Sequence, residues 1–143
     1  MNWIVCSILT ALLWAICYTS VEQVVKVIDK RTYIVIYSFF VLAVYLAIGW
    51  HKMPEDLVKL QNNTDNVSVW TLFAVLASIA GSYLSILAIE TSNASLAASL
   101  EITYPFWCML LAFLLFGHTM SITSIFGVIL IFAGVVTVVL GKN

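Results

Sequence analysis

The chain has 143 residues, of which 63% are hydrophobic and only 9% are charged, and its mean hydropathy is +1.08. Soluble domains carry about 25% charged residues, and a chain this short has a large surface to cover with them. The composition therefore excludes a water-soluble domain and predicts an integral membrane protein, while a net charge of −1 gives no electrostatic support to a nucleic-acid partner.

Five apolar stretches are long enough to cross the hydrocarbon core of a bilayer, which takes about 20 helical residues. The first lacks the basic start and the cleavage site of a signal peptide, so we expect it to be retained. The sequence predicts an all-α, multi-pass protein of a plasma or inner cell membrane, with one five-span domain over residues 1–143. Its spans are expected at about residues 3–28, 33–50, 67–89, 94–116 and 122–140.

The polar interval 51–66 is expected to be a loop at the membrane interface. Pro54 suits a first helical turn, and Glu55 and Asp56 follow it where the helix dipole favours anions. This pattern predicts a short interfacial helix within the loop.

Lysine and arginine are distributed unevenly between the two sides of the predicted bundle. Four lie on the side of the first connection and the C-terminus, against two in the long loop: Lys26, Lys30, Arg31 and Lys142, against Lys52 and Lys59. The positive-inside rule then places the N-terminus outside and the C-terminus inside. A bias this small also allows insertion in both orientations.

Small residues mark two of the spans as surfaces for close helix packing. Gly127, Gly134 and Gly141 recur every seven residues and lie nearly on one stripe, and Gly81 belongs to a small-residue face of the third span. Such faces let another backbone approach closely in lipid. Packing within one subunit and contact with a second subunit both remain open.

The last two spans resemble the close of an EamA-type repeat in the drug/metabolite transporter (DMT) superfamily. In that pattern, a helix with a mid-span proline ends in a glycine-acid turn and a glycine-rich helix follows. Pro105 matches the proline as a helix break, Gly117 the turn glycine, and Gly127 with Gly134 the final helix. The closing glycines are also similar to those of small multidrug-resistance proteins. One departure is His118, which stands where relatives usually have a glutamate.

Relatives of this kind usually contain two five-helix repeats of opposite orientation, with the substrate bound between them. The resemblance therefore implies a secondary transporter of small metabolites or amphiphilic drug-like solutes, working by alternating access. It further implies that this five-span unit pairs with a second copy, or a related half-transporter, as an antiparallel dimer. No cofactor or metal is implied, and no motif of ATP-driven transport or catalysis is present.

Glu101 is the main candidate for a functional acid, because ionisable groups inside a membrane are costly. It lies about two turns into the fourth span, and Pro105 cannot donate a hydrogen bond to its carbonyl. One alternative is a neutral acid that fixes helix packing. We hypothesise instead that Glu101 faces a polar cavity and binds substrate or a coupling proton.

Aromatic and hydroxyl side chains recur at helical spacing on several spans. Each stripe alone is consistent with ordinary helix contact, but together they predict a pocket for amphiphilic molecules. The candidate lining residues besides Glu101 are Trp14, Tyr18, Tyr37, Ser82, Tyr83, Tyr104 and Trp107.

Two further acids receive structural interpretations. Glu22 precedes Lys26 by four residues, which predicts an ion pair at the surface of one helix. Glu90 comes just before Thr91-Ser92-Asn93, residues that favour a helix cap, so we expect it near the N-terminus of the next helix.

The alternative function is a non-transporting membrane subunit or assembly partner of another membrane protein. Such a subunit would use the same glycine faces to bind its partner. A transporter requires Glu101, Trp14 and Tyr104 to converge on a cavity, whereas a subunit would pack them away.

Overall fold

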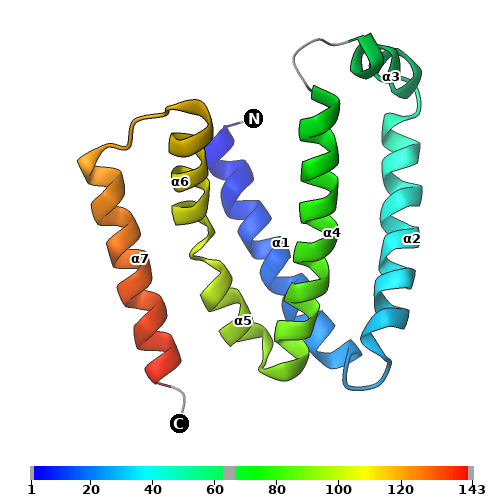
Figure 1. Cartoon of the computed structure of the whole chain (residues 1–143). Helices are drawn as coiled ribbons and strands as arrows, with labels where there is room; N and C mark the ends of the chain where they lie inside the picture. The colour runs from blue at the N-terminus through cyan, green and yellow to red at the C-terminus, as the bar shows by residue number, and fades with distance from the viewer. Residues whose placement is uncertain (1, 63–66, 142–143) are drawn as a thin grey trace. The chain divides into compact units, whose positions relative to one another are not determined.

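A computed structural model of the chain describes residues 2–62 and 67–141. Of the residues described, 86% are helical, and none of them lies in a strand. Five stretches of helix are long and apolar enough to cross a membrane (Figure 1). These findings confirm the predicted class, an all-α membrane protein with about five transmembrane helices.

The described residues form seven helices, because one span is divided in two and a short helix lies between two others. α1 ends at Val24, rather than at residue 28, because residues 25–27 form a turn. In chain order the helices are α1 (Trp3–Val24), α2 (Lys30–Gly49), α3 (Met53–Asn62), α4 (Val67–Thr91), α5 (Ala94–Glu101), α6 (Tyr104–Phe116) and α7 (Ile122–Leu140).

The chain divides into two compact units. Unit 1 comprises Met1–Glu22 and Thr91–Asn143, and so contains most of α1 together with α5, α6 and α7. Unit 2 comprises Gln23–Glu90 and contains α2, α3 and α4.

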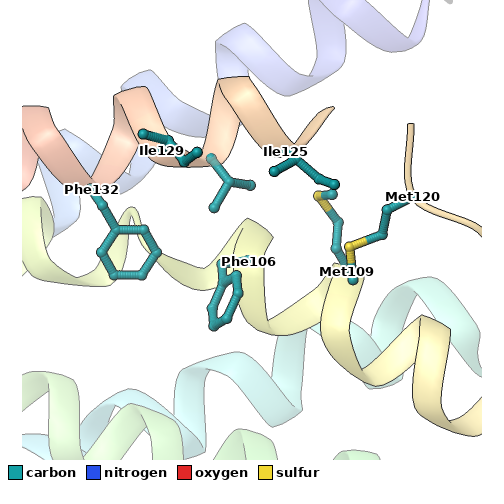
Figure 2. Close-up of a pocket in the computed structure, with 7 residues that line it drawn as sticks. Phe106, Met109, Met120, Ile125, Ile129 and Phe132 are labelled. Carbon is teal, nitrogen blue, oxygen red and sulfur yellow. The ribbon is translucent and has the colours of Figure 1, made fainter. Parts of the chain in front are cut away.

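The buried side chains of unit 1 are small or medium-sized and come from three helices. α5 packs against α7, and Phe106 at the start of α6 meets Phe132 of α7 edge-to-face, with ring centroids 5.5 Å apart (Figure 2). Most large apolar side chains remain exposed, as expected where lipid tails are the solvent. The residues at most 7% exposed are Val21 of α1, Ala94 and Ala97 of α5, and Val135 of α7.

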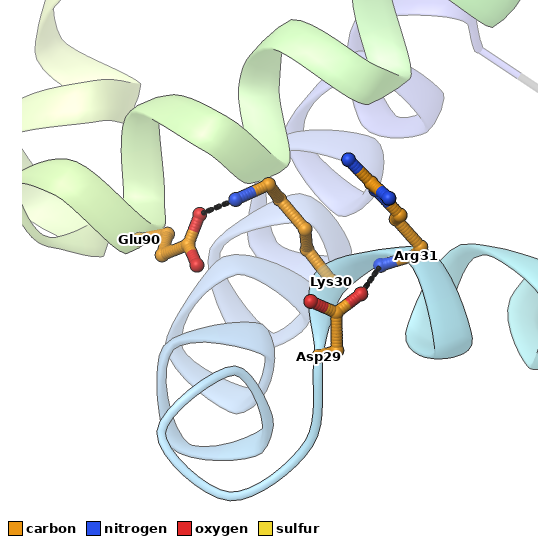
Figure 3. A network of polar contacts seen from close by, with 4 residues as sticks. All are labelled: Asp29, Lys30, Arg31 and Glu90. Carbon is orange, nitrogen blue, oxygen red and sulfur yellow. Dashed lines mark hydrogen bonds and ion pairs between the residues drawn. The ribbon is translucent and has the colours of Figure 1, made fainter.

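In unit 2, α2 and α4 run in opposite directions. The first residue of α2, Lys30, has its Nζ 2.6 Å from the Oε2 of Glu90 near the end of α4 (Figure 3). Asp29 caps α2 by accepting a hydrogen bond of 2.8 Å from the backbone N–H of Arg31. A polar contact therefore ties one helix end to the other.

α3 is the short helix expected in the loop, and its first turn carries Glu55 and Asp56. The Nζ of Lys59 lies 2.9 Å from a carboxylate oxygen of each. These hydrogen bonds, with Asp56 the stronger influence, raise the pKa of Lys59 above its ordinary value. The position of α3 at the membrane interface stays a prediction, and residues 63–66 of the expected loop lie outside the described part.

The fourth candidate span is interrupted at Ile102 and Thr103, between α5 and α6. Pro105 lies in the first turn of α6 and has no N–H to donate to the carbonyl of Glu101. At the interruption, backbone hydrogen bonds span three residues instead of four. They run from Thr103 N–H to the Leu100 carbonyl (3.2 Å) and from Phe106 N–H to the Thr103 carbonyl (3.0 Å). Glu101 is consequently the last residue of a short helix.

Backbone hydrogen bonds close the far end of α6, where relatives usually have an acid. Gly117 adopts φ = +67°, and its N–H bonds to the Phe113 carbonyl at 3.0 Å. The N–H of His118 bonds to the Ala112 carbonyl at 3.2 Å. The chain thus terminates this helix without the missing glutamate.

We expect Gly117→Ala to destabilise the protein by about 1–2 kcal/mol, because side chains with a Cβ disfavour the left-handed region. Gly49→Ala is the matched control, since Gly49 ends α2 with no atom within 4 Å of an added Cβ and without a positive φ. The measurement is denaturant unfolding of both variants in detergent micelles. Equal effects of the two substitutions would contradict the strained-turn explanation.

Candidate functional site

A chain of aromatic and polar contacts in unit 1 leads to Glu101. The rings of Trp14 and Tyr18 on α1 meet edge-to-face, with centroids 5.7 Å apart and planes at 83°. The hydroxyl of Tyr18 donates a hydrogen bond to Oε2 of Glu101 on α5. Tyr18 and Glu101 are both half-buried.

Local helix geometry explains this convergence. Trp14 and Tyr18 are four residues apart, so they lie on one face of α1. The break at Ile102 and Thr103 ends α5 at Glu101. A polar group in an apolar environment is costly unless it is hydrogen-bonded, and the Tyr18 hydroxyl supplies a donor to the carboxyl group. Glu101 is therefore held in the span by a contact between helices.

A second polar contact joins α1 to α5, at the opposite end of α5. Oε2 of Glu22 accepts a hydrogen bond from the backbone N–H of Ala94 at 2.9 Å. The side chain of Asn93 caps the same helix by accepting from the Leu96 N–H at 2.9 Å. Two of the N–H groups that lack partners within the first turn of α5 are thereby satisfied.

These contacts change the interpretation of two acids. Glu22 is an acid at the N-terminus of α5, and its predicted surface pair with Lys26 stays a prediction. Glu90 was also expected near this N-terminus, which stays a prediction; its Oε2 pairs with Lys30 in unit 2 (Figure 3). Proximity in sequence favoured Glu90, whereas Glu22 reaches α5 from 72 residues away.

The other candidate residues of unit 1 have separate surroundings. Tyr104 is 65% exposed and Trp107 is 53% exposed, both on α6 just beyond the break. The Trp107 ring contacts Phe106 edge-to-face at 5.0 Å. A role for Tyr104 and Trp107 in solute binding stays a prediction.

Three candidates belong to unit 2, and their roles also stay predictions. Tyr37 on α2 stacks on Tyr33, with ring centroids 6.1 Å apart. Ser82 and Tyr83 are exposed on α4.

The glycine faces differ from one another in detail. Apart from their chain neighbours and the backbone of their own helix, Gly81, Gly127 and Gly134 have no described atom within 4 Å of an added Cβ, so these positions face open space. Gly141 instead ends α7: its N–H bonds to the Thr137 carbonyl at 3.0 Å, and an added Cβ would lie 3.3 Å from that oxygen. A role of the glycines in packing or dimer contact stays a prediction.

An apolar cavity of about 300 Å³ lies between α6 and α7 (Figure 2). Its side chains offer no polar partner, so it suits an apolar group. Nothing in the sequence predicts this cavity, because such apolar residues are ordinary in any membrane span. The lining residues are Phe106, Met109, Met120, Ile125, Val128, Ile129 and Phe132.

The five candidate spans found among the described residues, one of them broken beside a carboxyl group, define a multi-pass membrane protein. Residues 1–140 match the sequence model of the EamA-like transporter family, and the chain belongs to that family. This confirms the resemblance seen in its last two spans. No curated protein and no solved structure matches the chain.

We expect a double-mutant cycle of Lys30→Met and Glu90→Gln to give a small stabilising coupling free energy, because the pair is partly solvated. The measurement is unfolding in detergent at low and high salt, where screening should reduce the coupling. Additive effects of the two substitutions would mean that the ion pair contributes no stability.

Proposed function

We propose that this protein is a secondary transporter of small metabolites or amphiphilic drug-like solutes in the cell membrane. Glu101 binds the solute or a coupling proton near the middle of the protein. The observation that carries this proposal is the hydrogen bond between Tyr18 and Glu101 beside the break in a membrane span. Membership of a transporter family supports it and does not favour a non-transporting subunit.

The chemistry of the break suits a binding site. Irregular backbone at membrane depth is tolerated only where protein buries it or where it lines a cavity. Broken helices are also where many transporters bind their solutes and ions. Here the Glu101 carboxyl group lies beside a carbonyl to which Pro105 cannot donate.

These acceptors favour a solute that carries hydrogen-bond donors or positive charge. Tyr18 already donates to Glu101, so an incoming donor or proton competes with its hydroxyl. Such competition gives the acid two states, bound to Tyr18 or bound to its ligand. Alternating access needs a two-state element of this kind.

The proposal includes a second five-span unit, most simply another copy of the chain in the opposite orientation. The small lysine and arginine bias supports insertion in both directions. Gly127 and Gly134 on α7 face open space and can admit a partner helix. A related half-transporter would serve equally as the partner.

We expect Glu101→Gln to lower the initial rate of ethidium transport at least about tenfold, because the amide can neither carry charge nor exchange a proton at the working pH. The measurement uses proteoliposomes with an imposed pH gradient and ethidium as the probe. Tyr18→Phe should change the apparent KM while leaving transport detectable.

Ser99→Ala is the control for these substitutions, since the Ser99 hydroxyl bonds to its own helix at the Ser95 carbonyl, 2.7 Å away. Full pH-dependent transport by Glu101→Gln would refute the role of this acid.

For the dimer, we expect both termini to be accessible from outside intact cells, each in a substantial fraction of the molecules. Asn2→Cys and Asn143→Cys are compared in a background without Cys6, Cys17 and Cys108, using a membrane-impermeant maleimide. Labelling after permeabilisation gives the total. If only Asn2→Cys reacts from outside, the orientation is fixed and the antiparallel homodimer is wrong.

A further inference from the structure

Two hydrogen bonds hold α5 against α1, one at each end of α5. At the N-terminal end, Ala94 N–H donates to Glu22; at the C-terminal end, Glu101 accepts from Tyr18. Tyr18 and Glu22 are four residues apart and lie one above the other on α1. A helix of eight residues, about 12 Å long, is therefore fastened at both ends to a single face of α1.

Apolar packing accompanies these bonds. Val21, between Tyr18 and Glu22 in sequence, is only 4% exposed. Ala94 and Ala97 of α5 are 3% and 2% exposed. Their small side chains permit close approach of a neighbouring backbone. Val21 of α1 and the buried alanines of α5 thus belong to the best-packed part of unit 1.

The attachment of α5 to α6 is weaker than an unbroken helix would provide. Ile102 and Thr103 separate the two helices, and Pro105 removes one bond from the helical ladder. A change in the angle between α5 and α6 can therefore be taken up at these two residues. An intact helix would resist the same change with its full set of backbone bonds.

The two fastenings of α5 differ in kind. The Glu22 carboxylate binds a backbone N–H at a helix N-terminus, where the dipole favours negative charge. That bond does not involve the group proposed to bind solute. The Tyr18 bond does involve the Glu101 carboxyl group. A proton or solute that binds Glu101 in place of Tyr18 therefore releases only the C-terminal end of α5.

We infer that Glu22 is a positioning residue for Glu101. It anchors the N-terminus of α5 to α1, so that α5 pivots about Ala94 when Glu101 exchanges Tyr18 for its ligand. The break at Ile102 and Thr103 absorbs the movement. This role rests on the proposed function of Glu101, and Glu22 itself does not contact the solute.

Two measurements test this role: the distance between labels on α1 and α5, and the transport of ethidium. Nitroxide labels at Ser7→Cys on α1 and Leu100→Cys on α5 report the position of the mobile end, since both residues are exposed. The labelled protein lacks its native cysteines and is diluted with unlabelled protein, so that only distances within one chain are measured. Ethidium transport in proteoliposomes gives KM and maximal rate on the same variants.

We expect Glu22→Ala to broaden the distance distribution about twofold and to raise the KM for ethidium about tenfold, with the maximal rate within about twofold, as fits loss of a charged hydrogen bond. Glu22→Gln keeps an acceptor for Ala94 N–H and should return KM to within about threefold of the original. Ser20→Ala is the control on the same turn, because its hydroxyl bonds to the Ile16 carbonyl of its own helix.

The outcomes separate this inference from the proposed function. If Glu22→Ala changes neither distance nor KM while Glu101→Gln abolishes transport, the positioning role is wrong and the proposed function stands. If Glu101→Gln transports normally, the proposed function fails, and the role of Glu22 fails with it. Should Glu22→Ala not fold, Glu22→Asp decides: its shorter carboxylate broadens the distances if Glu22 is the anchor and leaves them unchanged if it is not.

Discussion

A backbone within a bilayer has no water to bind its N–H and C=O groups, and the rest of this structure depends on how that constraint is met. Four spans meet it as continuous helices. The remaining candidate span, Ala94–Phe116, does not, because Pro105 interrupts it and leaves Glu101 at the end of α5. The carboxyl group of Glu101 and the carbonyl to which Pro105 cannot donate therefore lie at the same level of the span, and both need hydrogen-bond donors. The Tyr18 hydroxyl of α1 supplies one donor, to the carboxyl group.

The acids at the ends of α1 and α4 are also hydrogen-bonded, each to a different kind of donor. Glu22 binds the N-terminus of α5, and Glu90 binds Lys30. The first contact joins an acid to a fixed backbone donor and the second to a flexible ammonium group. Only the first constrains a helix on which the candidate site lies. The acids thus divide between holding helix ends together and, at Glu101, a proposed chemical role.

Local pattern predicted much of the fold. Apolar length gave the five spans, Asn93 was anticipated among the residues capping α5, and Pro105 coincides with the start of α6. Contacts between helices were harder to predict from the sequence, because Tyr18 and Glu101 are 83 residues apart and Lys30 and Glu90 are 60 residues apart. The spacing of residues along one helix predicts which of them share a face, but it does not predict which residue of another helix that face contacts. For the same reason the bond between Glu22 and the Ala94 N–H, 72 residues away, could not be predicted.

The contacts on the two sides of the break differ in a way that bears on transport. α1 holds α5 through directional hydrogen bonds, whereas α6 meets α7 through Phe106, Phe132 and a cavity that includes Met109 and Met120. Apolar contact has no preferred direction, and methionine adapts readily to a changed shape. Rearrangement is therefore expected to cost less between α6 and α7 than at the bond between Glu22 and Ala94 N–H. Alternating access that uses the break should keep the N-terminal end of α5 on α1 and repack the α6–α7 side.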